Sequence, residues 1–339
     1  MSDQYRGQHL PMRGRVALVA GASKGIGAAT AEAFADAGAA VVLAARDTTA
    51  LKAVTDGIEA RGGRVLAVGA DVTDAGSMHD LVEAALSAFG RLDAAFNNAS
   101  AGPMPAPLAD LDPDEFDLGI ATNIRGTFLG MKFQIPAMLA SGGGAIVNMA
   151  SIAGLNGTAN LAAYVAGKAG IIGLTKVAAL DYADQGIRVN VVAPGPILTY
   201  HLEAAGPQAQ RGAALSTPMR RVGTAAEVAR AVLWLCSDES SFITGTRDRH
   251  PDRRRAGCGQ QAAADVPPGP ADGRSSGGGL AGLAVFVAFV GEVYASVPWT
   301  KNENFVPMEL LMVAVFVLVL LVCCGLTRRF IEAPMQRLG

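Results

Sequence analysis

Three residues in one stretch of this chain have the types and spacing to exchange a proton with an alcohol or a carbonyl. Ser151 ends an apolar run, Tyr164 follows thirteen residues later, and Lys168 comes four residues after that. On a helix, residues four apart share a face, so the Lys168 ammonium would lie beside the Tyr164 ring. A nearby positive charge lowers the pKa of a phenol from its ordinary value of about 10. Tyr164 would then act as a general acid and base, with Ser151 holding the substrate oxygen. The same Tyr–Lys spacing is common on solvated helix surfaces. The rest of the sequence must therefore show whether this pair is catalytic.

A glycine-rich turn near the start of the chain has the context of a pyrophosphate site. Residues 16–20 form an apolar run of strand length, the spacing G-x-x-x-G-x-G follows, and an Ala-rich helical pattern comes next. In this context glycines let the backbone approach a pyrophosphate, and the helix N-terminus offers free N–H groups. A plain tight turn is the alternative. The residues expected to bind a dinucleotide here are Gly21, Ser23, Lys24, Gly25, Ile26 and Gly27.

The residues after the second apolar run bear on the choice of cofactor. Residues 40–44 are apolar, and Ala45, Arg46 and Asp47 follow. NAD-selective sites carry an acidic residue at the end of this strand, where it binds the ribose 2′-hydroxyl. Arg46, together with Lys24 from the glycine turn, instead suits a 2′-phosphate, so NADP(H) is favoured. If Asp47 takes the acidic role instead, NAD(H) is the cofactor. A second alternative is that Arg46 is a solvated surface side chain with no role in cofactor binding.

Strand and helix patterns alternate through the first 246 residues. Further apolar runs of strand length lie at residues 65–69, 92–96, 145–150 and 187–192, with helical patterns between them. This alternation predicts an α/β fold with a doubly wound parallel sheet of the Rossmann type, in three α/β/α layers. Ligands of such sheets bind at the carboxyl ends of the strands. Gly21, Asp71, Asn97 and Ser151 all fall at such ends.

A carboxylate cluster at residues 112–115 is better explained by a helix start than by chemistry. Asp112 has the position of an N-cap, Pro113 that of the first helical residue, and Glu115 that of the third. The helix that begins there carries Asn123 and runs toward Lys132. An Asn buried inside a helix needs partners for its amide.

Composition excludes several classes of function. The chain has 339 residues, of which 50 % are apolar and 17 % charged, so it can bury a sizeable core. Its net charge of −2 gives no electrostatic case for nucleic acid. The four cysteines lack C-x-x-C spacing and the four histidines are scattered, so we expect no metal site and no disulfide framework. The N-terminal residues contain no apolar signal run, which predicts a cytoplasmic domain.

The order and spacing of these motifs closely resemble those of the short-chain dehydrogenase/reductase family over residues 14–246. The matching motifs are GASKGIG from Gly21, Asp71-Val72, Asn97-Asn98-Ala99, Asn123, Ser151, Tyr164-x-x-x-Lys168 and PGPILT from Pro194. Ser100 is a departure, because the family usually has Gly there.

The resemblance implies a role for each matched residue. Tyr164 would be the catalytic acid/base, and Ser151 would orient and polarise the substrate oxygen. Lys168 would lower the tyrosine pKa and bind the nicotinamide ribose, and Asn123 would hold a water in the proton relay. Further cofactor contacts are implied for Asp71, Val72, Asn97, Ala99, Pro194, Gly195, Ile197 and Thr199. Family members usually form tetramers or dimers, and the polar, irregular stretch at residues 197–222 has the length of a lid.

The resemblance breaks after Thr246, where the family has a short buried strand that ends in Asp-Gly-Gly. Residues 247–255 instead hold five Arg and two Asp, a net charge of +3. A buried parallel strand is almost wholly apolar, so we expect the final strand to be missing and residues 187–192 to form an exposed edge. A solvated segment is the simple explanation, and nucleic-acid binding is another.

A frameshift is a further hypothesis for this region. If Asp252 to Arg255 were encoded GAC-CGA-CGG-CGG, reading one base later with G next would give Thr-Asp-Gly-Gly. The expected motif would then lie hidden at the expected place.

The remaining residues are expected to form a linker and an apolar tail. Residues 247–279 are basic and then rich in Pro and Gly, as in a linker without a core. Residues 280–290 are apolar, and residues 310–326 contain no charge, which suffices for a short membrane span. Two arginines follow at once, so residues 280–339 are predicted to form a two-helix membrane hairpin with cytoplasmic ends. A buried helix of a globular domain is the alternative. The ending TRRFIEAP resembles the C-terminus of integral-membrane acyltransferases, but that family's catalytic histidines have no counterpart here.

These observations predict an oxidoreductase that moves a hydride between NADP(H) and a secondary alcohol or ketone. Its domain would span residues 1–246, with a membrane tether through residues 280–326. The alternative is a cofactor-binding remnant with little turnover, fused or frameshifted onto a membrane segment.

Overall fold

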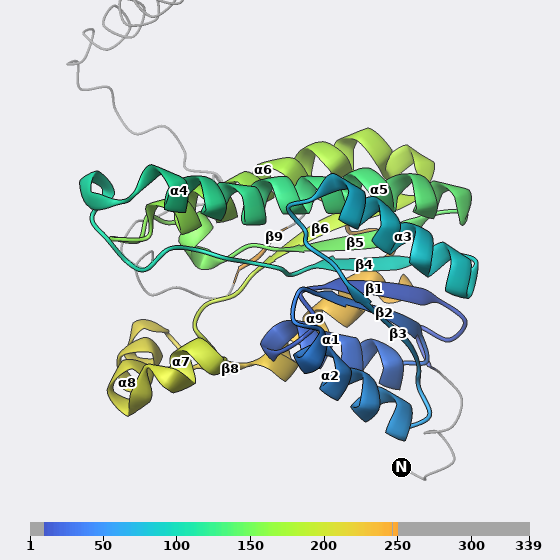
Figure 1. Cartoon of the computed structure of the whole chain (residues 1–339), viewed down its shortest axis with the longest axis horizontal. Helices are drawn as coiled ribbons and strands as arrows, with labels where there is room; N and C mark the ends of the chain where they lie inside the picture. Colours follow the sequence, from blue (N-terminus) through green and yellow to red (C-terminus); the bar gives the residue numbers. More distant parts are fainter. Residues whose placement is uncertain (1–9, 246, 250–339) are drawn as a thin grey trace, which may run out of the picture. The chain divides into compact units, whose positions relative to one another are not determined.

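The apolar runs of the sequence form one parallel sheet, in a computed structural model that describes residues 10–245 and 247–249. Its strands run in the order β3-β2-β1-β4-β5-β6-β9 (Figure 1). They are β1 (Val16–Ala20), β2 (Ala40–Ala45), β3 (Arg64–Gly69), β4 (Ala94–Asn97), β5 (Gly144–Met149), β6 (Ile187–Ala193) and β9 (Arg247–Arg249). Every neighbouring pair in this sheet is parallel, which confirms the predicted doubly wound α/β fold.

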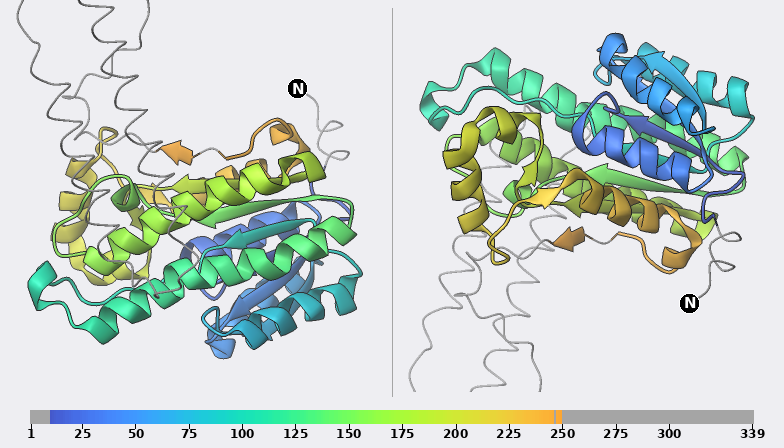
Figure 2. Two further views of the ribbon diagram at one scale, coloured as in Figure 1. Left: turned by 90° about the horizontal axis from the view of Figure 1, so that it is seen from above. Right: turned by 90° about the horizontal axis from the view of Figure 1, so that it is seen from below.

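Helices cover both faces of this sheet and complete the three layers (Figures 1 and 2). One face carries α1 (Gly25–Asp36), α2 (Thr48–Ala60) and α9 (Ala225–Cys236). The other carries α3 (Ala75–Phe89), α4 (Pro113–Ile120), α5 (Gly126–Ala140) and α6 (Ala162–Tyr182). Strands enclosed in this way are apolar on both sides, which explains why β1, β2 and β4 are buried along almost their whole length.

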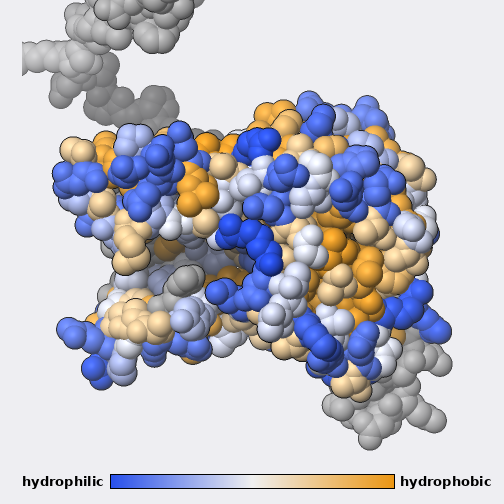
Figure 3. All heavy atoms as spheres, viewed as in Figure 1, coloured by the Kyte–Doolittle hydropathy of each residue, from blue (hydrophilic) through white to orange (hydrophobic). Residues whose placement is uncertain are grey.

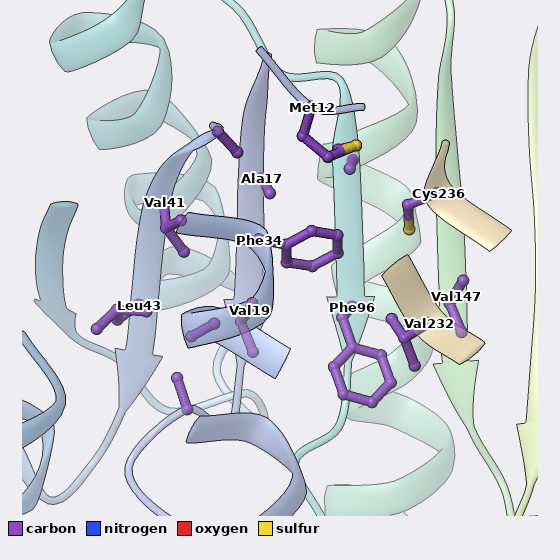
Figure 4. Packing of buried hydrophobic residues seen from close by; sticks show 14 of the residues in the cluster. Met12, Ala17, Val19, Phe34, Val41, Leu43, Phe96, Val147, Val232 and Cys236 are labelled. Carbon is purple, nitrogen blue, oxygen red and sulfur yellow. The ribbon is translucent and has the colours of Figure 1, made fainter. Parts of the chain in front are cut away.

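Successive residues of a strand enter opposite halves of the core. Val19 and Leu43 belong to the cluster on the α1–α9 side, around Phe34 and Phe96 (Figure 4). Leu18, the neighbour of Val19, belongs to the cluster on the α3–α6 side. This alternation follows from the period of two along a strand, and it fixes which side chains of each strand face which helices.

The last strand corrects the prediction that none would form after residue 246. Residues Arg247–Arg249 pair in parallel with Val191–Ala193 of β6. A ladder is made by backbone N–H and C=O groups, so a charged sequence can still form a few rungs. Beside it, the Gly245 backbone N–H donates to the Val189 carbonyl at 2.8 Å, and the Asn190 side-chain Nδ2 donates to the Ile243 carbonyl at 2.8 Å. The prediction that residues 187–192 form an exposed edge is therefore wrong as well.

The helix that carries Asn123 begins as predicted and then departs from regular geometry. The Asp112 carboxylate accepts hydrogen bonds from the Asp114 and Glu115 amides, and Pro113 is the first helical residue. Residues Ala121–Arg125 then form a turn of π-helix between α4 and α5. A π-turn in place of a continuous helix was not predicted, and it lies at Asn123 itself.

The segment predicted to be an irregular lid is mostly helical. It contains the short strand β7 (Ile197–Leu198), the helices α7 (Tyr200–Ala204) and α8 (Gly206–Ser216), and the strand β8 (Gly223–Thr224), which pairs with β7. The space-filling surface is hollowed between α4 and this α7–α8 segment (Figure 3).

One described helical stretch, Ala162–Gln185, passes a length and hydropathy test for a membrane span. It consists of α6 and the short turn after it, and its apolar residues Ile171, Ala178 and Ala179 pack into the core of the domain. The predicted hairpin at residues 280–339, the rest of the linker and the acyltransferase-like ending all lie outside the described residues.

Candidate active site

Tyr164 and Lys168 share one face of α6, as their spacing predicts. The Lys168 Nζ lies 5.6 Å from the centroid of the Tyr164 ring. The lysine side chain is only 1 % exposed, and its Nζ donates a hydrogen bond to the Met149 carbonyl at 2.9 Å. The ammonium is therefore anchored to the end of β5, directly beneath the tyrosine.

Ser151 reaches Tyr164 because a tight turn follows β5. Its side chain caps the 3₁₀ turn Ile152–Gly154 by accepting from the Ala153 amide at 3.2 Å. A Cβ added to Gly154 would lie 2.6 Å from the Lys168 backbone, so only a glycine lets this turn pack on α6. The Ser151 hydroxyl lines the same cavity as the Tyr164 phenol and lies close enough to lower its pKa. Three residues from two elements thus form one polar group.

The electrostatics of this group differ from the prediction. Burial raises the pKa of Tyr164, and the hydrogen bond from Ser151 opposes that rise. Burial also lowers the pKa of Lys168 to about 7. Lys168 was expected to depress the tyrosine pKa, but both groups are removed from water, which disfavours the charged form of each. The result is a tyrosine that stays protonated beside a lysine that titrates near neutral pH.

Asn123 lies beside α6 with its carboxamide fully engaged. The residue is completely buried, and its Nδ2 donates to the Ala101 carbonyl at 2.6 Å and to the Gly119 carbonyl at 2.8 Å. Its Oδ1 accepts from the Ser100 hydroxyl at 2.8 Å. A Cβ on Gly167 would lie 2.8 Å from the Asn123 Cβ, so α6 approaches the π-turn as closely as a glycine allows.

The glycine turn after β1 is built for close backbone approach. Gly21 has a φ of +80°, and a Cβ there would lie 2.7 Å from the Ala99 nitrogen. A Cβ on Gly27 would lie 2.0 Å from the Gly21 carbonyl oxygen. No side chain fits at either position, and the first turn of α1 is left open to an anion, as a pyrophosphate site requires.

Two adjoining cavities contain most of the predicted site residues. A cavity of about 400 Å³ is lined by Gly21, Ser23, Lys24, Arg46, Asp71, Val72 and Ala99. A cavity of about 270 Å³ is lined by Lys24, Gly25, Ile26, Ser151, Tyr164, Pro194, Gly195, Ile197 and Thr199. Both are lined in addition by Asn98 and Ser100. The structure therefore gathers residues from the ends of six strands, β1 to β6, along one cleft.

Asn97 is the predicted site residue whose side chain lies elsewhere. Its Nδ2 donates to Gln134 at 3.0 Å and to Asn148 at 2.9 Å, and its Oδ1 accepts from Gln134 at 2.8 Å. Adjacent side chains at a strand end point in opposite directions, so the next residue, Asn98, faces the cleft and donates to the Gly21 carbonyl at 3.0 Å. Asn98, Ser100, Thr122 and Tyr200 line the cleft without having been predicted as site residues, although strand alternation could have singled out Asn98.

Charged side chains surround the place where the 2′-group of the adenosine ribose is expected to bind. Arg46 and Asp47 are both exposed and line the same cavity, and the Asp47 carboxylate caps α2 by accepting from the Ala50 amide at 2.9 Å. The Asp71 carboxylate accepts from the Thr73 amide and hydroxyl at 2.9 and 2.8 Å, and these bonds, with Arg46 nearby, lower its pKa. Lys24 Nζ lies 5.1 Å from the centroid of the Tyr200 ring. Arg46 and Lys24 both line the cavity of about 400 Å³.

Within residues 10–245 and 247–249, no three His, Cys, Asp or Glu side chains come together as a metal site.

Comparison with known proteins agrees with this geometry. Residues 21–248 match the family model described as enoyl-(acyl carrier protein) reductase. The A-factor type gamma-butyrolactone 1′-reductase (1S-forming) of Streptomyces virginiae is 43 % identical over 236 residues, which are 68 % of this chain and 92 % of that protein. The cyclohexanol dehydrogenase of Acinetobacter sp. (strain SE19) is 43 % identical over 233 residues, 69 % of this chain and 92 % of that one.

Solved structures lead to the same conclusion. Levodione reductase superposes with a TM-score of 0.69 at 33 % identity, covering 73 % of this chain and 99 % of its own. A short-chain type dehydrogenase/reductase from Mycobacterium marinum gives 0.67 at 34 % identity, covering 70 % of this chain and 94 % of its own. With the parallel sheet, the glycine turn and the family model in agreement, the chain belongs to the short-chain dehydrogenase/reductase family of nicotinamide-dependent oxidoreductases.

Proposed function

We propose that this oxidoreductase transfers a hydride between NADP(H) and a ring-containing secondary alcohol or its ketone, with Ser151, Tyr164 and Lys168 handling the proton. The observation that carries the proposal is the placement of Ser151 and Tyr164 in the wall of one cavity that also contains residues of the glycine turn, with the buried Lys168 Nζ 5.6 Å from the centroid of the Tyr164 ring.

The protein's part in the reaction is to hold the substrate oxygen and move a proton. The nicotinamide supplies a hydride to the carbonyl carbon. The Tyr164 hydroxyl gives its proton to the carbonyl oxygen, so that C=O becomes CH–OH, and alcohol oxidation is the reverse. The Ser151 hydroxyl donates a second hydrogen bond to the same oxygen. Lys168 titrates near pH 7, and its charged form favours the tyrosinate left after proton transfer.

Support for a dinucleotide comes from the shape of the glycine turn. The positions of Gly21 and Gly27 exclude any Cβ, and the N-terminus of α1 carries no acidic side chain in its first turn. Support for NADP(H) over NAD(H) comes from the cations Arg46 and Lys24, and from Asp47, whose carboxylate already caps α2.

The substrate class rests on apolar groups beside the cleft and on the relatives. Ile152, Ile197 and Met219 line a small cavity whose charged residues, Arg221 and Glu227, are paired with each other, and Ile197 also lines the cavity that contains Tyr164. Met104 and Leu108 are 81 % and 76 % exposed in the loop before α4. Such a lining suits a compact hydrocarbon ring better than a charged substrate. Cyclohexanol dehydrogenase and levodione reductase, by their names, also act on compact molecules of this kind.

The test is turnover by the purified full chain with cyclohexanone and related ketones, followed by the loss of NADPH or NADH absorbance. We expect turnover with NADPH, and Tyr164→Phe should lower it at least about 100-fold while NADPH still binds. Arg46→Ser should weaken NADPH binding at least about tenfold and leave NADH binding nearly unchanged. Arg64→Ser, at the start of β3 and outside the cleft, is the matched control.

The competing proposal is a cofactor-binding remnant without turnover. It predicts NADPH binding in the wild-type chain and no reaction with any ketone or alcohol. That result would overturn the proposed enzyme activity and leave the nucleotide site standing.

Residues outside the described part add two further proposals. The linker at residues 247–279 and the hairpin at residues 280–339 would tether the domain to a membrane, and a dimer or tetramer would form as is usual for the family. Co-sedimentation of the full chain with lipid vesicles tests the first, and light scattering in detergent tests the second.

A further inference from the structure

Ser100 occupies a position where the family usually has a glycine, and its side chain makes a hydrogen bond that a glycine could not make. It follows β4 by three residues, in the loop that leads to α4. Its Oγ donates a hydrogen bond to the Oδ1 of Asn123 at 2.8 Å. A glycine at this position has no atom that could make this contact.

This bond completes the hydrogen bonding of a buried carboxamide. Asn123 is 0 % exposed, and its Nδ2 is already engaged by the Ala101 and Gly119 carbonyls. Ser100 supplies the hydrogen-bond donor that its Oδ1 needs. Buried amide oxygens without a donor are destabilising, so the serine fixes the amide in one orientation.

The same contact ties the loop to the catalytic elements. Ala101 is bonded to the Asn123 amide, and Gly102, the next residue, comes within 3.7 Å of the Tyr164 Cβ when given a Cβ of its own. On the other side, Asn123 packs on Gly167 of α6, three residues after Tyr164. The loop after β4, the π-turn and α6 therefore meet at Asn123.

Ser100 also lies where the two cavities of the cleft join. It is exposed, and it lines both the cavity with Arg46 and Asp71 and the cavity with Ser151 and Tyr164. A dinucleotide bound along both cavities would contact this loop. The position of the loop would then help to set where the nucleotide lies relative to Tyr164.

We propose that Ser100 is a positioning residue of this enzyme: through Asn123 it holds the loop at residues 98–102 and the π-turn at a fixed distance from Tyr164. It touches neither the reacting carbon nor the transferred proton. The inference rests on the proposed alcohol–ketone activity for its kinetic consequence, but the Ser100–Asn123 contact itself does not depend on that activity.

The simple alternative is an exposed serine whose hydroxyl has no consequence. The two differ in what Ser100→Ala does. A positioning role predicts that kcat falls about fivefold, the factor expected for one lost hydrogen bond, with less than a twofold change in the KM for ketone. Ser100→Thr keeps the hydroxyl and should restore kcat to within a factor of about two of wild type. Ser87→Ala, the same change on the exposed surface of α3, should leave kcat unaltered.

A double-mutant cycle tests the contact directly. Ser100→Ala should lower the melting temperature of the wild-type chain but should have no further effect in an Asn123→Ala background, because the acceptor is already gone. The same non-additivity should hold for kcat. Equal kcat for wild type and Ser100→Ala, or additive losses in the cycle, would overturn the proposal.

The cycle separates this inference from the proposed function. If the wild-type chain turns over no ketone or alcohol, the function fails, and the melting temperatures alone decide whether Ser100 and Asn123 are coupled. If turnover is present and the cycle is additive, the function stands and the positioning role falls.

Discussion

In the proposed mechanism the proton transfer depends on Tyr164 and Lys168, whose pKa values burial moves in opposite directions. Tyr164 is kept protonated because its anion would be poorly solvated, and Lys168 loses its proton near pH 7 for the same reason. An acid/base that works near neutral pH needs partners whose protonation changes there. Lys168 meets this need through its burial, with its Nζ fixed by the Met149 carbonyl.

Lys168 also makes the stability of the domain depend on pH. Its pKa is about 7 in the folded chain and near the ordinary lysine value of 10.5 in the unfolded chain. Between these values the unfolded state binds more protons, so the free energy of unfolding rises as the pH increases from about 7 toward 10. Lys168→Met should remove this slope. Melting temperatures at pH 7 to 9.5 check it, and an equal slope in wild type and variant would contradict the assigned pKa.

Some site residues could be predicted from sequence and others could not, for a physical reason. The Tyr164–Lys168 spacing determines their shared face, because helix geometry alone sets it. Asn97 and Asn98 have the same side chain, and only the direction each takes at the end of β4 separates a core residue from a cleft residue. The role of Ser100 depends on a contact with a residue 23 positions later, which no local pattern contains.

At the scale of elements, a series of hydrogen-bonded, buried polar side chains joins the sheet to helices α5 and α6. Asn97 of β4 bonds to Gln134 of α5 and to Asn148 of β5. The Asn148 Nδ2 donates to Thr175 Oγ1 of α6 at 3.0 Å. These four side chains are 5 % exposed or less. Because buried polar groups tolerate few alternative arrangements, this series fixes the register of α5 and α6 on the strands that end at the cleft.

Gln134→Met tests this chain of hydrogen bonds with little change in volume. It leaves the Asn97 Oδ1 without its donor, so the free energy of unfolding should fall by about 1–3 kcal/mol. Urea denaturation measures the change. Gln185→Met removes an exposed bond to the Asp181 carbonyl and should stay within about 0.5 kcal/mol of wild type. Equal losses in the two variants would mean that the buried bonds contribute no more than a surface contact.

The helix boundaries around the site show how far sequence patterns reach. The start of α4 could be predicted because its capping side chain and its proline lie next to each other in sequence. The π-turn at Ala121–Arg125 could not, because it accommodates an amide whose partners include the loop at residues 100–101. Its position is set by tertiary contacts.

At the scale of the whole molecule, the alternation of apolar runs and helices was enough to predict a doubly wound sheet. The same pattern failed to predict the last strand. Side-chain polarity suggested that residues 247–249 would not form a strand, but strands pair through backbone N–H and C=O groups. Three residues of β9 continue the ladder beside β6, and Ile243, Thr244 and Gly245 bond to β6 before it. The Arg188 guanidinium adds bonds to the Leu235 and Ser237 carbonyls, which fasten the end of α9 to the same edge. β6 is thus paired on the side that the sequence predicted to be an open edge, and β9 is the edge strand of the sheet.

The short β9 nevertheless leaves stability to be gained, and this bears on the frameshift hypothesis. β9 consists of two arginines and an aspartate, whereas a parallel strand enclosed by helices is normally apolar. Replacing the residues after Gly245 by an apolar strand that ends in Asp-Gly-Gly should raise the melting temperature by several degrees, since each kcal/mol corresponds to about 2–4 °C in a domain of this size. The control keeps residues up to Arg249 and follows them with a Gly/Ser segment of equal length.

If the two proteins have the same melting temperature, the three paired residues of β9 already stabilise the sheet fully. A lost reading frame is then not needed to explain β9. If the apolar strand is stabilising and the locus encodes it one base out of frame, the arginine run is the product of a shifted frame, and the cleft that ends in Tyr164 evolved on a longer sheet.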